Sequence, residues 1–164
     1  GRPDPVSGFG LMAATSLLVV RDALQELFGG ELAAVGVPLL WGAPVDAEDV
    51  SELRTVWWEN EVDADVAAYT MQGLAESYEM SLLVQCLPED GDVSARDAAV
   101  SALELIDLLY EATRDNPRPV DTSGGWDVVI RWAGHQLTTG RAERPAGFGA
   151  SWIARIGVEA TRCS

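Results

Sequence analysis

In three stretches of the chain, apolar residues recur at every second position. The first stretch contains Tyr78, Met80, Leu82, Val84 and Cys86. The other two begin at Trp126 and at Trp152. A period of two places successive side chains on opposite faces of an extended strand. These stretches therefore predict three β-strands, each with one buried face, and Pro88 ends the first.

Two longer segments follow the helical period instead. The first covers residues 11–28, and Gly29-Gly30 is expected to stop it. The second covers residues 94–115, with Ser94 as its N-terminal cap and Asn116-Pro117 after its end. The apolar stripe of this second helix contains Ala98, Ala102, Leu105, Ile106 and Leu109.

The remaining segments have weaker patterns. Short apolar runs predict strands over residues 37–41 and 55–58. Residues 59–76 are expected to form a long loop, with a short helix over 66–74 as the alternative. Residues 140–149 are expected to form a loop between the last two strands, too long for a tight hairpin.

The order of these elements predicts an α+β fold. It consists of a mostly antiparallel sheet of about four to five strands, with two long amphipathic helices packed on one face. Residues 1–10, which contain prolines and glycines, are expected to form an N-terminal arm. A length of 164 residues fits one domain, covering residues 11–164.

The charge of the chain excludes some classes of partner. There are 26 acidic residues against 11 basic ones, all arginine, and the net charge is −15. Binding to free DNA or to an anionic membrane requires a basic surface, so neither is expected as the main ligand. No apolar run is long enough for a membrane span. The two cysteines do not suggest a disulfide framework and fit a reducing compartment.

A search for catalytic groups finds little. His135 is the only histidine, and it lies within a predicted strand beside Gly134, where we expect a structural or solvent-facing side chain. Histidines and cysteines do not cluster as in metal sites. The acidic run from Glu59 to Asp65 lacks the spacing of a calcium-binding loop and suggests a solvated loop. We therefore expect no enzyme activity, no metal and no cofactor.

The tryptophans and the charge distribution suggest a subunit interface. Trp57 and Trp58 are adjacent, so in a strand one of them points away from the other and is available to a partner. Residues 46–65 contain eight acidic residues and only Arg54, whereas residues 130–164 contain five arginines and two acidic residues. Two complementary patches suit a head-to-tail contact that closes into a ring. The interface candidates are Trp57, Trp58, Glu59, Glu61, Asp63, Asp65, Arg141, Arg144 and Phe148.

The order and local character of the segments resemble the tail terminator proteins of long-tailed siphophages that infect actinobacteria. The resemblance covers residues 15–162 and contains no invariant motif. The segments that carry it are residues 19–28 (VVRDALQELF), 41–44 (WGAP), 56–58 (VWW), 76–84 (ESYEMSLLV) and 95–106 (ARDAAVSALELI), followed by the two terminal strands.

The resemblance implies a structural virion protein at the head-proximal end of the tail, assembled in the host cytoplasm. It implies a homo-oligomer, a hexameric ring, that caps the tail tube and stops its polymerisation. The implied partners are the tail tube protein and a head-completion protein, with residues 59–76 and 140–149 as docking arms. DNA passes through the lumen without specific binding, and acidic side chains let it slide.

Two alternatives remain open at this point. One is another head-tail connector, such as an adaptor, a stopper or a minor tail protein. The other is a cytoplasmic enzyme or small-molecule-binding protein with a pocket under the sheet.

We expect that the double charge reversal R141E/R144E weakens self-association, because it places like charges across the head-to-tail contact. Raised salt should also weaken assembly of the unaltered chain, since it screens exposed charge pairs. Light scattering at low and high salt measures the mass. An oligomer that resists both changes would contradict a contact based on charge segregation.

Overall fold

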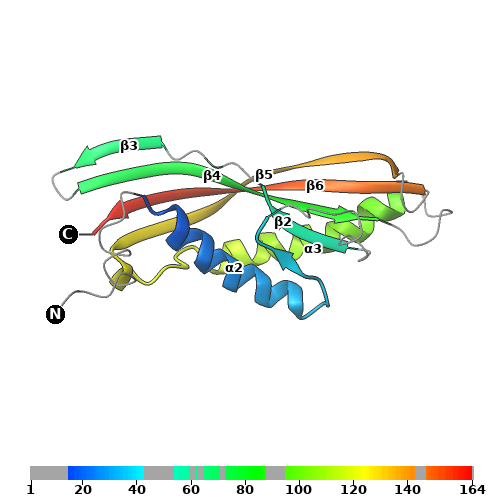
Figure 1. Cartoon of the computed structure of the whole chain (residues 1–164), viewed down its shortest axis with the longest axis horizontal. Coiled ribbons are helices and arrows are strands. Elements are labelled where there is room, and N and C mark those ends of the chain that lie inside the picture. Colours follow the sequence, from blue (N-terminus) through cyan, green and yellow to red (C-terminus); the bar gives the residue numbers. More distant parts are fainter. Residues whose placement is uncertain are drawn as a thin grey trace.

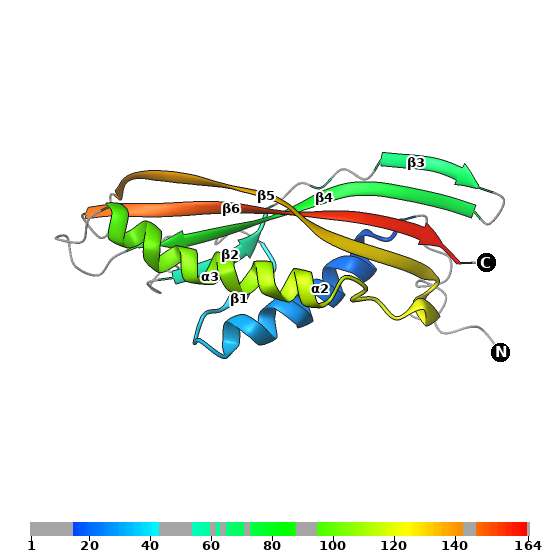
Figure 2. The same ribbon diagram turned by 180° about the vertical axis from the view of Figure 1, so that it is seen from behind.

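The computed structural model describes residues 15–42, 54–59, 62, 65–70, 73–87, 95–142 and 147–163. In Figures 1 and 2, two long helices lie on the same side of one twisted, elongated sheet. The predicted α+β class, with a mostly antiparallel sheet, is therefore confirmed. The predicted arm over residues 1–10 lies outside the described residues.

The described elements are two helices, one short 3-10 turn and six strands. The helical elements are α2 (Leu17–Ala33), α3 (Ala95–Asp115) and η2 (Thr122–Gly124). The strands are β1 (Leu39–Leu40), β2 (Arg54–Trp58), β3 (Asp65–Thr70), β4 (Gly73–Cys86), β5 (Trp126–Ala142) and β6 (Gly147–Arg162).

The strand order is β1-β2-β4-β6-β5, and β3 pairs with β4. All of these pairs are antiparallel except the two-residue parallel pair of β1 with β2. The first half of β4 pairs with β3 and the second half with β2. One outer edge of the sheet is therefore β5, and the opposite edge is β1.

The core lies between the helices and the sheet face that they cover. Every second strand residue points into it, and the strand members include Val56, Met80, Leu82, Val84, Ala154, Ile156 and Val158. The α3 stripe predicted from the sequence is buried. The helix α2 adds Val20, Leu24, Phe28 and Leu32, each fully buried. The residues that alternate in the strands and those that follow the helical period in α3 thus pack together in one core.

The predicted ends of the first helix were wrong. The helix α2 begins at Leu17 and continues through Gly29 and Gly30 to Ala33. Continuing the helix buries Leu32 completely, which outweighs a cost of about 1 kcal/mol for a glycine in a helix. The chain leaves the helix at Gly36, which has a φ of 73°, and the Val37 N–H donates to the Leu32 carbonyl.

Two predicted loops are largely strands. Within residues 59–76, β3 occupies Asp65–Thr70 and β4 begins at Gly73, so both the loop and the helical alternative were wrong. Within residues 140–149, β5 and β6 stay paired up to Ala142 and Gly147, so a long loop there was also wrong. The paired ends of β3 and β4 extend beyond the part of the sheet that the helices cover (Figures 1 and 2), where no core imposes apolar alternation on the sequence. The paired ends of β5 and β6 contain Gly140, Gly147 and Gly149, which interrupt the alternation.

A bulge in β5 changes which residues face the helices. The register with β6 shifts between Trp132 and Gly134. Before the shift, Trp132 lies opposite Ile156 on the helix-facing side, and after it His135 lies opposite Ala154 on the same side. Gly134 has a φ of 133°, and a Cβ added there would lie 3.0 Å from Nη2 of Arg155. The backbone of the bulge therefore requires glycine.

We expect opposite effects from alanine at two glycines. Gly134→Ala should lower the free energy of unfolding by about 1–3 kcal/mol, because it forces a strained φ. Gly30→Ala should raise it by about 0.5–1 kcal/mol, because a Cβ there meets no atom within 4 Å and alanine favours the helix. Urea denaturation of both variants measures these changes. Equal effects of the same sign would contradict the described backbone at the bulge or in α2.

Candidate functional site

The two adjacent tryptophans of β2 lie on opposite faces, as alternation requires. Trp58 is fully buried beneath α2, with its ring 6.2 Å from that of Phe28, and its Nε1–H donates to Oε1 of Gln25 at 2.7 Å. Trp57 points to the face without helices and lies opposite Leu83. It is partly buried. Trp57 thus remains an interface candidate, whereas Trp58 belongs to the core.

The charged candidates are only partly described. Glu59 is exposed at the end of β2, and its N–H donates to the Ser81 carbonyl at 3.0 Å. Asp65 is in β3, and Arg141 in β5 lies opposite Phe148 in β6. Glu61, Asp63 and Arg144 lie outside the described residues. The proposed contact between acidic residues and arginines therefore stays a prediction.

Sequence analysis missed an apolar surface beside the outer edge of β5. It contains four exposed apolar side chains, which we call the β5–α3 surface: Val100, Leu103, Tyr110 and Leu137. The spacing of Val100, Leu103 and Tyr110 indicates an apolar stripe on one flank of α3. This stripe lies beside the buried stripe of the same helix, so in the sequence it is easily taken for part of the core. The adjacent edge of β5 pairs with no strand in the described part of the chain.

Aromatic rings join α3 to the bulge of β5 behind this surface. Tyr110 meets Trp132 edge to face at 5.7 Å, and His135 lies between Trp132 and Trp152 at 6.1 and 5.7 Å. The Trp132 Nε1–H donates to Nδ1 of His135 at 3.2 Å. The Trp152 Nε1–H donates to the Ala99 carbonyl of α3 at 3.2 Å. These contacts fix the flank of α3 against β5.

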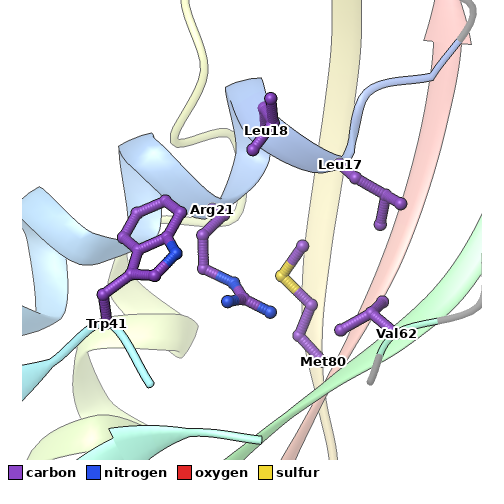
Figure 3. A pocket seen from close by; sticks show the side chains of 6 residues that line it. All are labelled: Leu17, Leu18, Arg21, Trp41, Val62 and Met80. Carbon is purple, nitrogen blue, oxygen red and sulfur yellow. The ribbon is translucent and has the colours of Figure 1, made fainter. Parts of the chain in front are cut away.

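A hollow of about 210 Å³ lies on the α2 side of the molecule, near β1. Figure 3 shows the Arg21 side chain extending from α2 into it, between Trp41 and Met80. We call this hollow the Arg21 pocket, and its lining residues are Leu17, Leu18, Arg21, Trp41, Val62 and Met80. Leu18 and Trp41 are each 47% exposed and form its rim.

Two indole rings hold the Arg21 guanidinium. Its central carbon lies 4.7 Å from the ring centre of Trp58 and 5.4 Å from that of Trp41. Its Nε is buried without a hydrogen-bond partner. No carboxylate of the described residues lies within ion-pair distance of it. Burial lowers the pKa of Arg21, so the charge is partly desolvated.

A buried polar group anchors the start of α2 next to this pocket. The Ser16 N–H donates to Oε1 of Glu76 at 2.6 Å, and the Ser16 hydroxyl lies 2.8 Å from the Tyr78 hydroxyl. Burial raises the pKa of Tyr78 far above its usual range, and the hydrogen bond from Ser16 opposes this only in part. The group fixes the helix turn from which Arg21 projects.

No protein-family model matches this sequence, and no curated protein is significantly similar to it. Within the described residues, no group of three or more potential metal ligands comes together. In the same part of the chain, no helix is long and apolar enough to cross a membrane. His135 is exposed on β5, as expected for a solvent-facing residue.

We expect the free energy of unfolding to fall as the pH rises above about 10, where the unfolded chain ionises its tyrosines while folded Tyr78 stays protonated. Below that pH, Tyr78 is neutral in both states and contributes no slope. Tyr78→Phe should remove this part of the alkaline slope. Urea denaturation between pH 9 and 11 measures it, with Tyr110→Phe, an exposed hydroxyl, as the matched control. An unchanged slope in Tyr78→Phe would contradict the prediction.

Proposed function

We propose that the chain is a ring-forming structural protein of a bacteriophage tail, of the tail terminator kind. In this role it forms a homo-oligomer, a hexameric ring, that caps the tail tube, stops its growth and joins it to a head-completion protein. It is located in the virion and has no enzymatic activity. DNA passes through the ring without specific binding.

The observation that carries this proposal is the pair of unlike surfaces at opposite edges of one sheet. The β5–α3 surface and the unpaired edge of β5 lie at one end of the strand order, and the Arg21 pocket lies beside β1 at the other. An isolated chain gains nothing from an exposed apolar stripe next to an open strand edge. A head-to-tail contact between unlike surfaces covers both in every copy of a closed ring.

The charge also supports a ring around DNA more than a DNA-binding protein. With a net charge of −15, a lumen lined by this chain repels phosphates and lets the duplex pass. The resemblance of residues 15–162 to tail terminators selects the tail tube and a head-completion protein as partners.

Another head-tail connector of the same virion shares these features and is the second candidate. A small-molecule-binding protein is the third candidate. The Arg21 pocket of about 210 Å³ is smaller than most ligand sites, which enclose roughly 300–1,000 Å³, and a hollow of about 310 Å³ between α2 and the segment after α3 is at the lower end of that range.

We expect the purified chain to form a hexamer, in solution or on isolated tail tubes. The double variant L103D/L137D should be monomeric, because it buries carboxylates in the proposed interface. Light scattering measures the mass, and electron microscopy measures the length of tubes polymerised with and without the chain. Val35→Asp, which alters an apolar residue exposed in the turn after α2, is the control and should not change the mass. A chain that stays monomeric with and without tubes would overturn the proposal.

A further inference from the structure

The Arg21 pocket has the chemistry of a receptor for a carboxylate on an apolar segment. The guanidinium lies within cation–π distance of two indole rings, and its N–H groups can donate to a carboxylate of a partner. The walls around it are apolar, from Leu17, Val62 and Met80. Among the described residues no carboxylate lies within ion-pair distance of this partly buried cation, and a buried charge without a partner is costly, so the pocket favours an anionic occupant.

The rim of the pocket indicates that this occupant is a protein. Leu18 and Trp41 are large apolar side chains, each nearly half exposed, directly beside the arginine. Tryptophan and arginine are the residues most enriched at the energetic centres of protein interfaces.

The α3 flank of the same chain carries a matching group. Asp107 is exposed between Leu103, four residues before it, and Tyr110, three residues after it. Residues at these spacings are neighbours on a helix surface, so they form one ridge with a carboxylate between two apolar side chains. Asp107 makes no ion pair with another described residue, and Glu111, one turn further on, has the same charge. A cation from outside would relieve this like-charge pair.

We propose that the α3 ridge of one copy docks on the Arg21 pocket of the next copy, with the Asp107 carboxylate against the Arg21 guanidinium. Leu103 and Tyr110 then pack against the rim residues Leu18 and Trp41. One half of this contact lies on the β5 flank of α3, which packs on β5 and β6, and the other lies on α2, which packs on α3 and on β1. Each copy thus has one of each half, as a head-to-tail ring requires.

This inference rests on the proposed ring, and it names the contact that closes it. It differs from the contact of residues 46–65 with Arg141 and Arg144, so the two can be separated by mutation.

The test is a charge exchange across the contact. Asp107→Arg alone and Arg21→Asp alone should each weaken self-association roughly tenfold or more, since each leaves like charges facing each other. The double variant R21D/D107R should recover most of the association, because the pair is restored with its signs reversed. Light scattering over a dilution series measures the association, and circular dichroism checks that each variant is folded.

A matched control and a milder variant complete the experiment. Glu31→Arg changes the net charge by the same amount as Asp107→Arg at an exposed position of α2, and it should leave association unchanged. Should Arg21→Asp fail to fold, Arg21→Gln replaces it and should weaken association in the same direction.

The possible outcomes separate this inference from the proposed function. The Arg21–Asp107 contact is overturned if both single variants self-associate as strongly as the unaltered chain. It is also overturned if the double variant self-associates no more strongly than the weaker single variant. Either result leaves the ring in place. A chain that is monomeric before any substitution, even on tail tubes, overturns the ring itself and this contact with it.

Discussion

The packing of α3 against the helix-facing side of β6 is the contact on which the rest of the structure depends. Both surfaces include small buried residues, Ala98 and Ala102 on the helix and Ala150 and Ala154 on the strand. Small side chains let the helix lie close to the central strands. The position of α3 then sets where its second, exposed stripe emerges beside β5.

The bulge at Gly134 adjusts the edge strand to this helix. Without the shift, His135 would point away from α3 and Gln136 would take its place. With it, His135 joins Trp132 and Trp152 in one row of rings that ends on Tyr110 of α3. A single glycine therefore connects the conformation of the edge strand to the surface that we propose as an interface.

The sequence predicted the elements whose pattern is imposed by the core. The alternation that begins at Tyr78, Trp126 and Trp152 identified β4, β5 and β6, and α3 begins one residue from its expected start and ends where expected. It failed where the pattern is weak: β3 pairs only at the sheet margin, and the paired ends of β5 and β6 are interrupted by Gly140, Gly147 and Gly149. The end of α2 was missed because the burial of Leu32 overrides the local preference of two glycines.

The candidate site was less predictable than the fold. Trp57 and Trp58 were correctly expected to point apart, because alternation alone decides this. The Arg21 pocket could not be anticipated, since it forms only when β1 and β2 bring Trp41 and Trp58 to the same guanidinium. The apolar flank of α3 was present in the sequence as Val100, Leu103 and Tyr110, but its exposure depends on how far β5 extends over the helix.

The outer edge of β5, which pairs with no other described strand, also bears on how the proposed ring would form. Among the described strands none pairs with the outer side of β5, although the Ile130 N–H there donates to the Pro117 carbonyl, and the rest of such an edge is a template for disordered aggregation. Every copy has the same net charge of −15, so two copies repel each other once they approach within about one Debye length, roughly 10 Å at moderate salt, beyond which the repulsion is screened. This repulsion slows association, because it opposes chance encounters between two edges. An approach that brings a local cation to a local carboxylate meets a lower barrier. For the ring that we propose, the acidity of the chain would thus favour encounters in a productive orientation.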